Sequence, residues 1–140
     1  MNNAVFMALF LYTKFILKDT MVMSAKKWSF QKNGRSIELQ PPEDVPPGTS
    51  EALTDFIFAE IGRSTRNLAN YRSIWERETS ENESGRGLSG NMTSQTLDED
   101  GNVLLESLYD RWDTVKITRA QFEKFLDEFA EYLRTSQDNE

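Results

Sequence analysis

The spacing of apolar residues changes at Thr118, and this change constrains the fold more than any other feature of the sequence. Before it, residues 112–117 alternate between two unlike faces, as a strand does; after it, apolar residues recur at helical spacing. Thr118 and Gln121 match a capping box, which Ile117 and Phe122 flank as a hydrophobic staple. We therefore expect a strand leading into a capped C-terminal helix whose apolar stripe is Phe122, Phe125, Leu126, Phe129 and Leu133.

Two hairpins are predicted from turn chemistry. Apolar-rich runs at 92–97 and 103–109 flank an acidic turn in which Gly101 can take a positive φ angle. A second hairpin is expected over residues 28–39, with Asn33-Gly34 as its two-residue turn. The acidic turn does not have the register of a calcium loop, because Gly101 is its fourth position and Tyr109 its twelfth, where an EF-hand needs Gly at six and Glu at twelve.

The middle of the chain predicts helix followed by loop. A helix is expected to begin at Thr49 or Ser50 and to break or kink near Gly62. Residues 79–90 are rich in Ser, Glu, Asn and Gly and predict an exposed loop. The expected buried stripe of the helical region is Leu53, Phe56, Ile57, Ile61, Leu68, Tyr71 and Trp75.

These elements predict a small single α+β domain in which antiparallel hairpins pack against two or three helices. Its length of 140 residues suits one domain, which we place at 23–140. Residues 1–22 are interpreted as a leader outside this domain, either non-native, with translation starting at Met21 or Met23, or disordered. The alternatives are a membrane or signal segment, for which the apolar run is short, and a packed N-terminal helix.

Composition excludes several classes of chemistry. The chain has no Cys and no His, which argues against disulfides, zinc or haem sites and Cys-nucleophile catalysis, and favours a reducing, cytoplasmic location. No cofactor is expected. The net charge is -7, although the first 27 residues carry four Lys against one Asp. An acidic body of this kind repels nucleic acid and anionic membranes and attracts basic partners.

The candidate partner-binding residues are mostly acidic. We interpret the carboxylates at the end of the second helical segment, in the loop, in the acidic turn and near the start of the last strand as one surface. Such a surface imitates a phosphate backbone to a basic protein. The bland alternative is a set of scattered, solvated charges. We expect aromatic anchors beside them at Tyr71, Trp75, Tyr109 and Trp112. The candidate residues are Glu76, Glu78, Glu81, Glu83, Asp98, Glu99, Asp100, Asp110, Trp112 and Asp113.

A catalytic interpretation of the same carboxylates is weaker. Asp110 and Asp113, with Glu106 upstream, have the chemistry for acid–base catalysis. The chain nevertheless lacks a Gly-rich phosphate loop, a His and a nucleophile motif. We therefore expect a protein that is not an enzyme.

The C-terminal region resembles small bacterial immunity proteins, the cytoplasmic partners of polymorphic or contact-dependent growth-inhibition toxins. The resemblance rests on residues 100–110, on Val115-Lys116-Ile117-Thr118, and on Phe122 with Phe125-Leu126, in a chain without Cys or His. It implies a non-enzymatic protein that binds the C-terminal domain of one cognate toxin, commonly a nuclease, and blocks or displaces its active site. We expect a monomer or weak dimer. The alternative from another class is a cytoplasmic chaperone or adaptor for a secreted effector.

Overall fold

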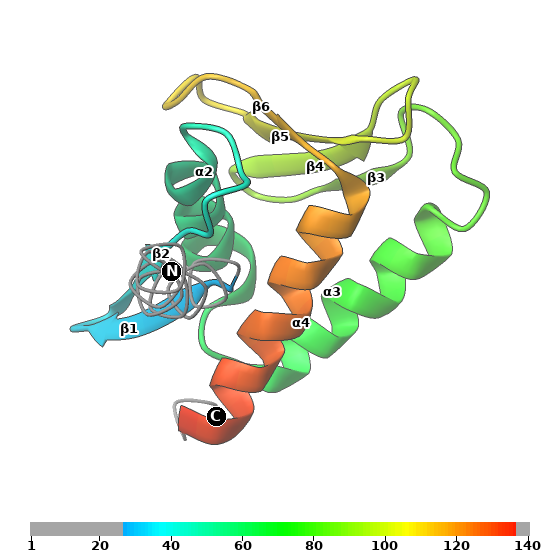
Figure 1. Ribbon diagram of the computed structural model, residues 1–140. Helices are drawn as coiled ribbons and strands as arrows, with labels where there is room; N and C mark the ends of the chain where they lie inside the picture. Colours follow the sequence, from blue (N-terminus) through cyan, green and yellow to red (C-terminus); the bar gives the residue numbers. More distant parts are fainter. Residues whose placement is uncertain (1–26, 137–140) are drawn as a thin grey trace, which may run out of the picture.

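The computed structural model describes residues 27–136, which form two antiparallel sheets and three α-helices. In Figure 1 the four-stranded sheet β3-β4-β5-β6 lies across one end of α3 and α4. The β1–β2 hairpin lies next to α2, on the side of that helix away from the four-stranded sheet. This arrangement confirms the predicted α+β class. The elements are β1 (Ser29–Asn33), β2 (Ser36–Gln40), α2 (Thr49–Phe56), the π-helical turn η1 (Ile57–Ile61), α3 (Thr65–Glu78), β3 (Gly87–Ser89), β4 (Thr93–Leu97), β5 (Val103–Ser107), β6 (Val115–Ile117) and α4 (Arg119–Ser136).

The start of α4 has the predicted capping box. The Thr118 hydroxyl accepts the Gln121 backbone N–H at 3.0 Å, and the Gln121 side chain accepts the Thr118 backbone N–H at 2.8 Å. The whole predicted stripe, from Phe122 to Leu133, is buried. Because β6 ends at Ile117 and α4 begins at Arg119, a single residue separates strand from helix.

Replacing Thr118 by Ala should destabilise the protein by about 1 kcal/mol, because the Gln121 N–H loses its acceptor at the exposed helix start. Chemical denaturation measures this loss. Thr135→Ala, near the other end of α4, is the control, since that exposed hydroxyl only returns to backbone carbonyls of its own helix. Equal losses in the two variants would contradict the capping role.

Both predicted hairpin turns are confirmed. Gly101 has φ of 81°, and the Asp98 N–H donates to the Asn102 carbonyl at 2.8 Å, closing the turn between β4 and β5. Gly34 has φ of 63° in the turn between β1 and β2. Positive φ is accessible to Gly at little steric cost, which is why these two positions set the registers.

The predicted helix break lies at Gly62. Its N–H donates to the Ile57 carbonyl at 2.7 Å, five residues back, so α2 ends in a π-helical turn. Gly62 then takes a positive φ of 71°, and α3 starts after Ser64, whose hydroxyl accepts the Asn67 N–H. The wider turn leaves Ile57 and Ile61 buried while Phe58 is 65% exposed.

One hydrophobic core joins the two sheets and the helices. Alternate residues of β5 and β6, Val103, Leu105, Val115 and Ile117, face it from the four-stranded sheet. On the other side of the core, the indole ring of Trp28 meets the Phe125 ring at 5.1 Å, edge to face. The core therefore links the first described residues to the last helix.

Two expectations about individual elements were wrong. The segment 79–90 is not loop throughout, because Gly87–Ser89 form β3 and pair with β4. Strand β6 covers only Val115–Ile117, since Trp112 and Asp113 belong to the connection before it. The expectation of a leader at 1–22 lies outside the described residues. Within the described part of the chain, no helix is long and apolar enough to cross a bilayer.

Candidate functional site

Six of the candidate acidic residues lie together at one end of the four-stranded sheet. The loop after α3 joins the end of β4 through two backbone hydrogen bonds, from the Gly85 N–H to the Leu97 carbonyl at 2.8 Å and from the Leu97 N–H to the Arg86 carbonyl at 2.9 Å. This contact places the loop beside the β4–β5 turn. We call this surface the acidic end; it consists of Glu78, Glu81, Glu83, Asp98, Glu99 and Asp100.

The carboxylates of the acidic end fall into two groups. Glu78 pairs with Arg86 and lies 3.6 Å from Arg77, while Asp98 lies 3.5 Å from Lys116. These two charges are thus partly neutralised. The other four, on Glu81, Glu83, Glu99 and Asp100, are exposed and form no ion pair within residues 27–136.

Asp98 has a structural role as well as a charge. Its side chain accepts the backbone N–H groups of Asp100 at 2.8 Å and Asn102 at 2.9 Å. Desolvation raises the pKa of Asp98, but the backbone N–H groups of Asn102 and Asp100, together with Lys116, outweigh it and lower that pKa below its usual value. Asp98 therefore holds the turn that presents Glu99 and Asp100.

Arg119, at the start of α4, holds the loop of the acidic end through hydrogen bonds. Its guanidinium donates to the Thr79 carbonyl at 3.1 Å, to the Thr79 hydroxyl at 2.6 Å and to the Asn82 side chain at 3.2 Å. It also donates to Glu123 at 2.8 Å and lies 5.9 Å from the Trp75 ring centroid. Partial burial raises the pKa of Glu123, but hydrogen bonds from Arg119 and Trp75 outweigh it and lower that pKa.

The remaining candidates do not join the acidic end. Asp110, Trp112 and Asp113 belong to the β5–β6 connection at the opposite end of β5, whose five residues span roughly 16 Å. Glu76 is exposed on α3, where it lines a groove toward α4. Glu106, considered for catalysis, accepts a hydrogen bond from Ser94 at 3.3 Å on the sheet. The structure thus divides the surface that the sequence suggested.

Three of the four expected aromatic anchors pack against other parts of the protein and are buried or half-buried. Tyr71 and Trp75 are buried, at 7% and 3% exposure, which confirms their predicted place in the helical stripe and shows that their expected role as surface anchors was wrong. Trp112 is half-buried, and its indole N–H donates to the buried carboxylate of Asp55 at 2.9 Å. Tyr109 is 65% exposed.

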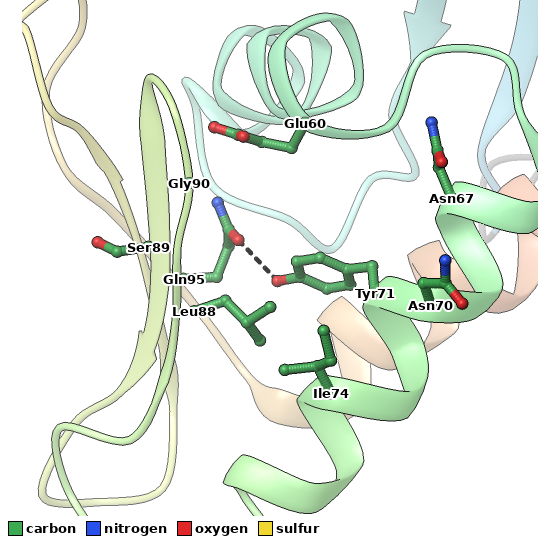
Figure 2. A pocket seen from close by; sticks show the side chains of 9 residues that line it. All are labelled: Glu60, Asn67, Asn70, Tyr71, Ile74, Leu88, Ser89, Gly90 and Gln95. Atoms are coloured by element: carbon green, nitrogen blue, oxygen red, sulfur yellow. Dashed lines mark hydrogen bonds between the residues drawn. The ribbon is translucent and has the colours of Figure 1, made fainter.

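A second candidate feature is a cavity that the sequence did not indicate. It has a volume of about 270 Å³ and is bounded by η1, α3 and β3, as Figure 2 shows. Tyr71 reaches across from α3 toward the sheet, and Ile74 and Leu88 face each other below it. The lining residues are Glu60, Asn67, Asn70, Tyr71, Ile74, Leu88, Ser89, Gly90 and Gln95.

Glu60 binds the turn between β3 and β4. Its Oε2 accepts the backbone N–H groups of Met92 and Thr93 and the Thr93 hydroxyl, each at 3.0 Å, and its Oε1 accepts the Asn91 N–H at 2.9 Å. A Cβ atom at Gly90 would lie 2.1 Å from Oε1, so Gly at this position leaves room for the carboxylate. The π-helical turn and the sheet are thereby tied together.

A buried chain of hydrogen bonds continues from Glu60 to Tyr71. The Gln95 side chain donates to the Thr93 hydroxyl at 2.7 Å and accepts the Tyr71 hydroxyl at 2.6 Å. Burial first, and then the negative charge of Glu60, raise the pKa of Tyr71 well above its usual value. Tyr71 therefore remains a neutral hydrogen-bond donor at the base of the cavity.

No local pattern could have identified this network. Glu60 stands between Ile57 and Ile61 in an apolar stripe, and its partners lie more than thirty residues later in the chain. Within residues 27–136, no group of three or more His, Cys, Asp or Glu side chains is placed to hold a metal ion. Comparison of the chain with protein-family models, with curated proteins and with solved structures gave no match.

Proposed function

We propose that this protein is a cytoplasmic, non-enzymatic inhibitor of the immunity type, which binds a basic toxin domain through its acidic end. The observation that carries the proposal is a set of four exposed carboxylates that form no ion pair within residues 27–136. They lie on a loop that is hydrogen-bonded to the end of β4 and on the turn that follows β4. Lys and Arg side chains that hold nucleic-acid phosphates find the same kind of acceptor in a carboxylate. A nuclease domain is therefore the partner that we expect.

The fixed geometry of these loops supports binding. Backbone hydrogen bonds to Leu97, the side chain of Asp98 and the guanidinium of Arg119 already hold the surface in one arrangement. A partner then pays little conformational entropy to order it. This is the property expected of an inhibitor that must reach its toxin quickly and hold it.

Association with the toxin domain should slow as ionic strength rises, because acidic steering is screened over a Debye length that falls from about 10 Å at 0.1 M salt to about 3 Å at 1 M. Stopped-flow measurement of the on-rate tests this with the toxin domain encoded beside the gene. Changing Glu99 and Asp100 to Lys should lower the on-rate about tenfold or more at low salt. Asp98 is left in place because it closes the turn.

The matched control is the same charge change at Asp110 and Asp113, on the opposite end of the sheet. It alters the net charge of the protein equally, so a surface-specific effect should be much smaller there. If both pairs of substitutions slow association alike, only overall charge matters. If neither does, or if the toxin domain does not bind, the proposed function is lost.

A second candidate function, an adaptor for a secreted effector, is favoured by the surface around Phe58. This side chain is 65% exposed, with cavities of about 380 and 420 Å³ on its two sides. Exposed aromatic side chains beside grooves are typical of protein-binding surfaces. Phe58→Glu should abolish binding of an effector while Glu99→Lys/Asp100→Lys leaves it intact; the reverse result favours the inhibitor.

A further inference from the structure

The cavity of Figure 2 has the carboxylate of Glu60 at its edge. No Lys or Arg within residues 27–136 forms an ion pair with Glu60, whose charge is stabilised only by backbone N–H groups and the Thr93 hydroxyl. Its Oε2 accepts three hydrogen bonds, but Oε1 accepts one and keeps acceptor capacity. A cation is thus the ligand that Glu60 attracts.

The other polar groups of the cavity add acceptors rather than positive charge. Asn67 uses its side-chain N–H₂ to donate to the Ile61 carbonyl at 3.1 Å, which leaves its oxygen to accept. The Gln95 oxygen accepts from Tyr71 and has a second lone pair, and Asn70 is exposed at the rim. A planar guanidinium has five N–H donors and no acceptor, so it matches this set.

The walls and size of the cavity suit a side chain. Ile74 and Leu88 form an apolar wall against which the methylene groups of an arginine can pack. The volume of about 270 Å³ is below the usual range of cofactor and drug-sized sites. A ligand of a few heavy atoms, inserted from a partner surface, is what this space accommodates.

The cavity lies along the same helix as the acidic end. Tyr71 and Glu78 are both in α3, seven residues or roughly 10 Å apart along its axis. A standard protein interface covers about 800 Å² of each partner, which is large enough to cover both features. We propose that the cavity between η1, α3 and β3 receives the guanidinium of an arginine from the basic partner and anchors it beside Glu60.

The proposal rests on the proposed function only in taking the partner to be a basic protein, and its test needs no toxin. The probe is N-butylguanidinium, titrated into the full-length protein and followed by ¹H–¹⁵N NMR, with N-butylurea as the neutral planar analogue. We expect saturable shifts at Gly90, Tyr71 and the Gln95 side-chain amide, with a dissociation constant on the order of 10 mM. Butylurea should bind at least about fivefold more weakly, because it lacks the charge.

Two substitutions on α3 distinguish an effect of charge at the cavity from an effect of the protein's net charge. Asn70→Lys places a cation at the rim and should weaken butylguanidinium binding about fivefold or more, without touching Glu60. Ser73→Lys makes the same change at an exposed position that lines the groove toward α4, and should leave binding unchanged.

Absence of saturable shifts, equal binding of butylurea, or equal losses in the two Lys variants would overturn the proposal. These outcomes concern the cavity alone. The proposed function is tested separately by the salt dependence and the Glu99→Lys/Asp100→Lys variant, so either idea can fail while the other stands.

Discussion

Replacing Phe125 by Ala should destabilise the protein by about 3–5 kcal/mol. The Phe125 side chain is fully buried, and its ring meets those of Trp28 at 5.1 Å, Phe30 at 5.9 Å and Phe129 at 6.0 Å. Truncation leaves a cavity where helix and N-terminal hairpin meet, and the rigid aromatic neighbours cannot collapse into it fully. Urea denaturation, monitored by Trp fluorescence and by circular dichroism, measures the loss.

Glu131→Ala, on the exposed face of the same helix, provides the control for Phe125→Ala. Glu131 pairs with Arg134 at the exposed surface, where solvent screens the ion pair, so its removal should change stability far less than Phe125→Ala does. A loss below about 1 kcal/mol for Phe125→Ala would mean that the stripe of α4 is not the centre of the core.

Replacing Glu60 by Ala should destabilise the protein by about 2–4 kcal/mol. Three backbone N–H groups and the Thr93 hydroxyl lose their acceptor, and the Thr93 side chain is fully buried. Denaturation gives the global loss. Hydrogen exchange should in addition show faster exchange of the Met92 and Thr93 amides than of the amides in α4.

Two further variants serve as comparisons for the stability loss of Glu60→Ala. Glu60→Gln keeps one acceptor oxygen and should lose less stability than Ala. Glu76→Ala removes an exposed carboxylate from α3 and should change stability by less than about 0.5 kcal/mol. If Glu60→Ala loses no more stability than Glu76→Ala, water replaces the carboxylate at the β3–β4 turn, and the Glu60 network does not stabilise the fold.

The elements predicted correctly are those whose signals are local. A capping box places its two partners three residues apart, so Thr118 and Gln121 can be recognised together in the sequence. The turns at Gly34 and Gly101 depend on the backbone freedom of one residue. The break at Gly62 follows for the same reason, although the π-helical turn before it leaves no distinct pattern.

The elements predicted wrongly depend on contacts between distant segments. β3 has only three residues, Gly87–Ser89, and exists because β4 pairs with it. Tyr71 and Trp75 are buried as the helical stripe predicted, and only the expectation of surface anchors was wrong, because the Tyr71 hydroxyl and the Trp75 indole N–H donate to Gln95 and Glu123 from distant segments. The candidate acidic residues do not form one surface, because strand β5 separates the turn at Asp100 from the connection at Asp110.

The contact between the first hairpin and the last helix sets an order of events during synthesis on the ribosome. An isolated two-stranded hairpin is marginally stable in water, and the β1–β2 hairpin packs Phe30 against Phe129 and Tyr132 of α4. The backbone N–H of Trp28 donates to the Glu128 carboxylate at 2.7 Å, across 100 residues of chain. At about 5–20 residues per second, the hairpin emerges roughly 5–20 seconds before the helix that stabilises it. Nascent chains that stop short of α4 should therefore remain sensitive to protease at their N-terminal hairpin, and protection should appear only after α4 has left the exit tunnel.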